Sequence, residues 1–400
     1  MAYKEPSFKP TRSQMINIIK ENITPMTRKE VVSLGDSVGR TSVYDILAKH
    51  SLPNMPVSGC DGISVRFEDF KNGIPDTSNW KENVDYKFSN TGVALSSEFD
   101  TVIAIEDVKF DENGSIEISS CPKKHGEMVG KVGGNLIKDE VLVYEGEKIT
   151  LGHIGILASA GITVVTVYAK PVVTFIPTGD ELVSTGMELP LGKNIESNSK
   201  MLEVYIKEWG GIPILYPIIP DDINQIKNAV KNALAESDIV LICAGSAKGN
   251  KDFTLDVLEQ MGDIVVRELG HGPGKHGSLT MVGEKHIIGL PGPARGAELI
   301  AGFYVKGAIA FMNHQEYPLP EIVDAILVDE IKGAWIDFVS SVYVYRENGK
   351  LYAKPVKTRG KTWIEGFRMS NGSYYCTKRT DVSAGTIIPI ELSVPSYYIK

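Results

Sequence analysis

Continuous apolar runs alternate with amphipathic stretches through the middle of the chain. The runs at 172–177, 239–243 and 286–290 are rich in β-branched residues, which predicts strands buried on both faces. Between the first two, residues 201–209, capped by Gly210, and residues 223–235 place apolar side chains at helical spacing. This alternation predicts a parallel sheet with right-handed crossovers over residues 167–315.

The segments on either side of this region have different patterns. Near-helical spacing predicts helix from residue 12 to about 50 and again over 149–160, ending at Gly161. Short alternating segments such as 101–105 lie between the two and predict a β-rich module. Because the helical segments flank this module, we expect them to pack together and the module to be an insertion. Asn348-Gly349 predicts a hairpin within a strand-rich C-terminal region.

The pattern therefore predicts a multidomain α/β protein. We expect a helical domain of residues 1–50 plus 136–166, a β-rich inserted domain of residues 51–135, an α/β domain of residues 167–315 and a small C-terminal β-barrel or sandwich of residues 316–400.

Composition excludes several classes of protein. A chain of 400 residues with 42% hydrophobic and 23% charged residues exceeds what one core can use. The net charge of −8 gives no basic footprint for nucleic-acid binding. We expect neither a membrane span nor a signal peptide, since the apolar runs are strand-sized or interrupted by charge. Four scattered cysteines disfavour zinc or a disulfide framework and indicate a cytoplasmic protein.

Polar loops follow the three predicted strands, at the sheet edge where open α/β sheets bind ligands. They span residues 178–181, 244–252 and 289–296, and a fourth glycine-rich loop, 270–277, precedes the last strand. Glycines let backbone N–H groups approach a phosphate. The cations that could neutralise an anion are Lys248, Lys251, Lys275 and Arg295, and the carboxylates that could hold Mg²⁺ are Asp180, Glu181 and Asp252.

Each loop alone has an ordinary explanation. A Gly-Asp-Glu turn is often a helix start with acids on its dipole, and a glycine-rich loop is often a tight turn. Lys275 alone is typical of a solvated surface charge. The joint placement of the loops after successive strands is what favours a ligand site.

Several motifs carry a resemblance to a known family. Segments 177–182, 196–202, 273–275 and 289–292 resemble MoeA, the molybdopterin molybdotransferase, and the related domain of gephyrin. Upstream, Ser58–Arg66 resembles the family's Ser-Ala-Met-Asp-Gly-Tyr-Ala-Val-Arg. Thr91–Val93 and Phe99–Val102 resemble its Thr-Gly-Ala and Cys-Asp-Ala-Val elements. The motifs span nearly the whole chain in the family's order, so this chain resembles a divergent member.

The resemblance implies an elongated helical domain, a β-rich insertion, a three-layer α/β molybdopterin-binding domain and a C-terminal β-barrel. It implies an elongated homodimer whose active site lies between the α/β domain of one subunit and the insertion of the other. The implied reaction is Mg²⁺-dependent insertion of molybdate into adenylylated molybdopterin with release of AMP. Molybdopterin adenylyltransferase is a candidate substrate donor, and neither nucleic acid nor membrane is an expected partner.

The resemblance also assigns roles to residues. The implied catalytic residues are Asp61, Thr91, Glu181 and Asp252, with Glu181, Asp252 and Asp180 as metal ligands. Asp61 and Thr91 are expected to meet Asp180, Glu181 and Asp252 across the dimer. The implied substrate-binding residues are Thr178, Gly179, Asp180, Ser197, Asn198, Ser246, Lys248, Gly249, Lys251, Lys275, Pro291, Gly292 and Arg295.

The sequence departs from the family mainly in its loops. Gly272 stands for the first lysine of the family's Lys-Pro-Gly-Lys-Pro, and Leu142 stands where the family has an aspartate. Lys248, Lys251 or Arg295 could compensate for the missing lysine. The alternative function is therefore a non-catalytic or repurposed paralogue that binds molybdopterin or a nucleotide as a carrier, sensor or scaffold.

Overall fold

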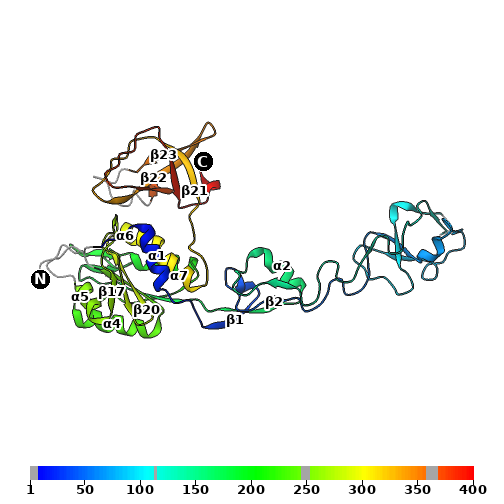
Figure 1. The fold of residues 1–400 in the computed structure, drawn as a ribbon, viewed down its shortest axis with the longest axis horizontal. Helices are drawn as coiled ribbons and strands as arrows, with labels where there is room; N and C mark the ends of the chain where they lie inside the picture. Colours follow the sequence, from blue (N-terminus) through cyan, green and yellow to red (C-terminus); the bar gives the residue numbers. More distant parts are fainter. Residues whose placement is uncertain (1–7, 112–114, 245–252, 357–367) are drawn as a thin grey trace. The chain divides into compact units, whose positions relative to one another are not determined.

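The computed structural model describes residues 8–111, 115–244, 253–356 and 368–400, and the chain forms two compact units (Figure 1). Unit 1 combines the N-terminal segment up to Arg28 with residues 168–400. Unit 2 is formed by residues 29–167, so it is inserted into unit 1.

A six-stranded sheet lies at the centre of unit 1, in the order β15-β12-β16-β20-β19-β17. The parallel strands are β12 (Val172–Ile176), β15 (Ile212–Leu215), β16 (Ile239–Ala244) and β20 (Lys285–Pro291). β19 (Ser278–Val282) and β17 (Asp263–Val266) extend one edge in antiparallel pairing. The three predicted strands and their parallel arrangement are thus confirmed.

Helices cover both faces of this sheet and make three layers (Figure 1). On β12, Val173 and Phe175 pack on the face covered by α3 (Asn198–Glu208), α6 (Ala294–Ile300) and α7 (Lys306–Met312), with the π-helical turn η4 (Ala301–Val305) between the last two. Ile176 packs on the opposite face, which is covered by α4 (Ile223–Glu236) and α5 (Phe253–Met261). This two-sided burial explains why the strands read as continuous apolar runs.

The N-terminal helix α1 (Arg12–Asn22) differs from the prediction in the domain to which it belongs and in its length. Met15 and Ile19 are buried in the core of unit 1, so α1 and the residues up to 28 belong to unit 1, whereas the 149–160 helix belongs to unit 2. The helix also stops far short of residue 50. Pro25 disfavours helix for Thr24, and the β-branched Val31-Val32 lies in β1 (Lys29–Ser33).

The C-terminal strands of unit 1 close into a five-stranded β-barrel, as predicted. They are β21 (Ile322–Leu327), β22 (Asp337–Glu347), β23 (Lys350–Pro355), β24 (Gly372–Cys376) and β25 (Ile387–Leu392). The predicted hairpin turns at Asn348 and Gly349, which both have positive φ angles, 48° and 77°. β18 (His271–Gly272) pairs with β22 and so joins a loop of the α/β region to the barrel.

In its described residues, unit 2 contains a β-rich part and one α-helix, α2 (Leu151–Ser159), which is followed by Gly161 at a φ of 78° as predicted. Its three-stranded sheet is β5 (Lys87–Ser89), β4 (Gly62–Val65) and β6 (Thr101–Ala104). Shorter strands pair as β1 with β11 (Val164–Tyr168), β2 (Ile46–Leu47) with β10 (Val141–Val143), β3 (Val57–Ser58) with β9 (Val129–Gly130), and β7 (Val108–Phe110) with β8 (Ile116–Ile118).

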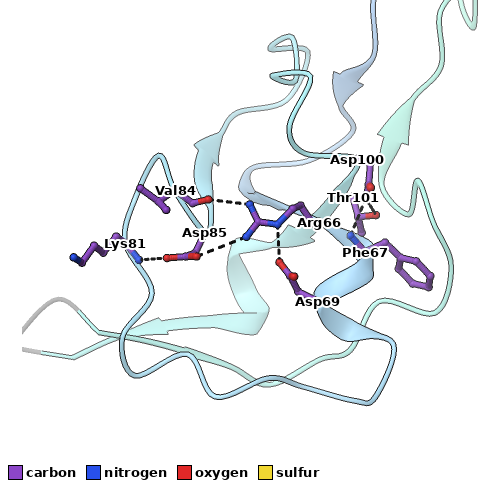
Figure 2. A network of polar contacts seen from close by, with 8 residues as sticks. All are labelled: Arg66, Phe67, Asp69, Lys81, Val84, Asp85, Asp100 and Thr101. Atoms are coloured by element: carbon purple, nitrogen blue, oxygen red, sulfur yellow. Dashed lines mark hydrogen bonds and ion pairs between the residues drawn. The ribbon is translucent and has the colours of Figure 1, made fainter.

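A polar network holds the loops around β4 and β6 (Figure 2). Arg66 Nε donates to Asp69 Oδ2 at 3.0 Å, and its Nη1 donates to the Val84 carbonyl at 2.9 Å. Asp100 Oδ1 accepts from the Phe67 N–H at 2.9 Å and from the Thr101 hydroxyl at 2.8 Å. Arg66 and Asp100 belong to two of the family-like motifs, and here both stabilise the insertion. In the part of the chain that the structure describes, no helix has the length and apolar character to span a membrane.

Candidate functional site

The strand order of the sheet places its topological switch point, here called the crevice, between β12 and β16. β12 is followed by α3 and then β15 on one side, while the chain after β16 continues to strands on the other side. Such a reversal of direction is the usual ligand position in open α/β sheets. Thr178 follows β12, and its buried hydroxyl donates to the carbonyl oxygen of Cys243 in β16 at 2.6 Å. The ends of β12 and β16, from which the first two predicted loops leave the sheet, are therefore joined by a hydrogen bond.

The acidic turn after Thr178 is shaped by a glycine. Gly179 has a φ of 145°, and a Cβ there would lie 2.7 Å from a carboxylate oxygen of Glu181. The Glu181 carboxylate thus folds back over Gly179, while Asp180 Oδ1 accepts from the N–H of Asp221 at 3.3 Å. All three acids are exposed. Sequence patterning did not single out Asp221, which lies 41 residues further along the chain.

The turn does not begin a helix. It leads into β13 (Leu182–Ser184), which pairs in parallel with β14 (Asn194–Glu196). The ordinary explanation of these acids as helix-dipole partners is therefore wrong, and their carboxylates remain available at the edge of the sheet.

The start of α3 places a buried amide beside two strand ends. Asn198 Nδ2 donates to the Gly292 carbonyl at 3.0 Å and to Cys243 Sγ at 3.4 Å. Asn198 Oδ1 is buried with no hydrogen-bond partner among the described residues. The preceding residue, Ser197, is exposed, and Glu196 is buried and accepts from the Ser199 N–H at 3.1 Å. Asn198 therefore connects the ends of β16 and β20 on one side of the crevice.

Cys243 is a site residue that sequence reasoning missed, because cysteines were judged only by their paired spacing. Burial raises the pKa of its thiol to about 12, so the thiol stays neutral at physiological pH. A neutral thiol between an amide and a carbonyl serves as packing and a weak hydrogen-bonding group rather than as a nucleophile.

The loop over residues 270–277 lies at the same sheet edge. Ser278 at the start of β19 pairs with Gly289 near the end of β20. Gly274 has a φ of 100°, and a Cβ there would lie 2.7 Å from the Ile300 side chain of α6. Lys275 is held next to this contact, with Nζ 5.7 Å from the ring centroid of Trp335. Of the predicted residues, Pro291 ends β20 and Gly292 follows it, shortly before α6 begins at Ala294.

Arg295 has partners other than a ligand. Its guanidinium forms an ion pair with Glu298 and donates to the Ser341 hydroxyl of the barrel at 2.7 Å. The predicted anion contact would require this side chain to leave or share these partners. As it stands, Arg295 stabilises the junction of α6 with the barrel.

Unit 2 brings together Asp61 and Thr91. The N–H and hydroxyl of Thr91 both donate to Asp61 Oδ1, at 2.7 and 3.0 Å, and these bonds lower the pKa of Asp61. The next residue, Gly62 of β4, lies very close to the backbone of β6. A Cβ on Gly62 would lie 1.9 Å from the Ile103 carbonyl oxygen. Asp61 and Thr91 are exposed and form one polar group, while their implied catalytic role stays a prediction.

Five predicted site residues, Ser246, Lys248, Gly249, Lys251 and Asp252, lie outside the described residues. Within residues 8–111, 115–244, 253–356 and 368–400, no group of three or more His, Cys, Asp or Glu side chains could hold a metal ion. Asp180 and Glu181 alone are too few for a closed all-protein cage. They do suit a cation that keeps waters and binds substrate phosphates, as Mg²⁺ does.

Comparison with known proteins agrees with this architecture. Residues 11–161 match the MoeA N-terminal region (domain I and II), and residues 174–310 match a probable molybdopterin binding domain. A molybdopterin molybdenumtransferase of Haemophilus influenzae is 27% identical over 95% of this chain and 96% of its own length. One of Bacillus subtilis is 28% identical over 82% of this chain and 81% of its own length.

Solved structures show the same fold. Two structures of the molybdopterin biosynthesis MoeA protein from Pyrococcus horikoshii superpose with TM-scores of 0.79 and 0.73. They are 23% and 24% identical, cover 97% and 96% of this chain, and are themselves covered completely. With both family regions present in order and the whole fold shared, this chain is a member of the MoeA family.

Proposed function

We propose that this protein acts in molybdenum cofactor biosynthesis as a molybdopterin molybdenumtransferase. The observation that carries the proposal is the Thr178–Cys243 hydrogen bond across the β12/β16 crevice, with Asp180 and Glu181 directly at its rim. Relatives that share nearly the whole chain carry this activity in their names. The finer proposal is that the substrates are molybdate and adenylylated molybdopterin and that AMP leaves.

The residues of the crevice suit anionic substrates. Lys275 supplies a positive charge beside the sheet edge, and the glycines at 274 and 292 let the backbone approach phosphate or molybdate oxygens closely. The Thr178 hydroxyl and the Asn198 amide hold the strand ends at fixed separations, so the ligand meets a preorganised edge.

Mg²⁺ is the metal that we propose for the acidic rim. Asp180 and Glu181 are exposed and oxygen-bearing, and Asp252 is the further carboxylate expected from the sequence. When bound, Mg²⁺ would polarise the phosphoanhydride of the substrate and neutralise charge on the leaving phosphate. The protein's own part is to hold the carboxylates at the mouth of the crevice, where Asp180 is oriented by the Asp221 N–H.

We further propose a cytoplasmic homodimer in which Asp61 and Thr91 of the partner subunit complete the site, with molybdopterin adenylyltransferase as the donor of substrate. The lowered pKa of Asp61 supports this role, because it keeps the carboxylate charged. Mixing Asp61→Asn protein with Glu181→Gln protein tests it. A shared site regains part of its activity in mixed dimers, whereas a site within one chain stays inactive.

The direct test is an assay with purified protein, adenylylated molybdopterin, molybdate and Mg²⁺. AMP release measured by chromatography, together with activation of a molybdenum-free molybdoenzyme, is the expected result. Tight ligand binding without AMP release would overturn the transferase. That outcome would favour the carrier, sensor or scaffold alternative, for which the commitment of Arg295 to Glu298 is the supporting observation.

A further inference from the structure

Trp335 is an exposed tryptophan on a fixed backbone. Its side chain is 64% exposed. On its N-terminal side, the Gly333 N–H donates to Asp381 Oδ1 at 2.8 Å and the Ala334 carbonyl accepts from the Arg379 N–H at 2.6 Å. On its C-terminal side, β22 begins at Asp337, which pairs with His271 of β18. The indole is therefore presented to solvent from a position that cannot easily shift.

Lys275 faces this indole from a second fixed loop. Its Nζ lies 5.7 Å from the ring centroid of Trp335. The same β18–β22 pairing that places Trp335 also anchors the start of the Lys275 loop, and Gly274 fixes its middle against Ile300. No carboxylate of the described residues forms an ion pair with Lys275 Nζ. The ammonium group therefore remains available to an anion beside a flat aromatic surface.

A purely structural explanation accounts poorly for this pair. A Lys–Trp contact at an exposed site stabilises a protein only weakly. The barrel is already joined to this region by the β18–β22 pairing and by the Arg295–Ser341 hydrogen bond. A contact that served only to hold the barrel would gain more by burying the indole, since most of the stabilisation from a tryptophan comes from burial.

We propose that Trp335 and Lys275 form a subsite for a planar heteroaromatic ring that carries a phosphate. The ring stacks on the indole, and Lys275 Nζ binds the phosphate oxygens. The choice of ligand class rests on the proposed function, because adenylylated molybdopterin carries two such rings, the adenine and the pterin. Trp335 is thereby assigned a role that neither its position in the barrel nor the sequence pattern indicated.

Calorimetric titration with three probes tests the subsite: AMP, neopterin monophosphate and ribose 5-phosphate. Trp335→Leu is expected to weaken binding of one ring-bearing probe about tenfold and to leave ribose 5-phosphate unchanged. Trp335→Phe should retain most of the affinity, because it keeps a stacking ring. Lys275→Gln should weaken all three. The probe that loses affinity in Trp335→Leu identifies the ring as adenine or pterin.

The control is Tyr397→Leu, which removes another aromatic ring of the same unit, 78% exposed. It should bind all probes as the unaltered protein does. Equal effects of Trp335→Leu on probes with and without a ring, no effect on any probe, or no binding of either ring-bearing probe would each overturn the subsite.

The AMP-release assay on the same variants separates this inference from the proposed function. Ring-selective binding that depends on Trp335, without AMP release from the unaltered protein, would support the subsite and overturn the transferase. Normal AMP release, with ligand binding that does not depend on Trp335, would support the transferase and overturn the subsite.

Discussion

The hydroxyl of Thr178 donates a 2.6 Å hydrogen bond to the carbonyl oxygen of Cys243, so the ends of β12 and β16 are joined by a side chain where their backbone pairing stops. Thr178→Val keeps the shape of the side chain and removes the bond. Since a buried carbonyl loses its partner, the free energy of unfolding should fall by about 1–2 kcal/mol. Urea denaturation measures this, and Thr178→Ser should restore most of it. Unchanged stability in the valine variant would contradict the role given to this bond.

Glu181 should control the dependence on magnesium without affecting the fold. Its carboxylate is exposed, so Glu181→Gln leaves the core intact and removes one oxygen ligand charge. We expect the Mg²⁺ concentration for half-maximal AMP release to rise roughly tenfold or more. Glu188→Gln, at an exposed position in the following loop, is the matched control and should leave the magnesium titration unchanged. Identical titrations for both variants would exclude Glu181 as a metal ligand.

Asp61 should titrate below its ordinary range because Thr91 hydrogen-bonds to its charged form. The folded-state pKa is depressed, so the associated stability is present above the unfolded-state pKa of about 4 and is lost as pH falls through the lower folded-state pKa. Thr91→Val removes the hydroxyl bond but keeps the backbone N–H, which is the larger cause. NMR titration of the Asp61 carboxyl should therefore show a partial return toward the ordinary pKa. A pKa that does not change would exclude the hydroxyl as a cause.

Cys243 should resist alkylation in the folded protein, because its thiol is buried and its pKa is raised to about 12. Mass spectrometry after iodoacetamide treatment at pH 8 should find its peptide unmodified in buffer and modified in denaturing urea. Rapid labelling in buffer would show that the crevice opens far enough to expose the end of β16.

Gly62 should be intolerant of any side chain, since a Cβ would lie 1.9 Å from the Ile103 carbonyl of the neighbouring strand. Gly62→Ala is expected to destabilise unit 2 by about 3 kcal/mol. Gly155→Ala is the matched control, because a Cβ there meets nothing within 4 Å in α2 and alanine favours helix by about 1 kcal/mol. Limited proteolysis should then cleave unit 2 faster only in the first variant.

The sequence was sufficient for elements with a strong local pattern. The β-branched runs in β12, β16 and β20 predicted strands, and Asn348-Gly349 predicted a hairpin turn. For α1 the pattern predicted a helix but not its packing partner. Met15 and Ile19 mark an apolar face, but such a face does not specify which core it joins.

Contacts between segments far apart in the chain could not be predicted from the sequence. Asn198 and Gly292 are 94 residues apart, and only the folded sheet shows that one bonds to the other. Asp221 could not be associated with Asp180, because the association is a backbone N–H that any residue type could supply. Trp335 could not be distinguished from a core tryptophan, because exposure depends on the barrel around it.

The bond between the Ala169 N–H and the Arg28 carbonyl, 2.8 Å long, joins the two points at which the chain leaves unit 1 and re-enters it. Because these exits are adjacent, a short turn could replace residues 29–167 without stretching the backbone that remains. Unit 2 is thus an inserted domain whose two connections to unit 1 lie side by side. Each unit could gain, lose or exchange sequence over evolution while the other kept its own core.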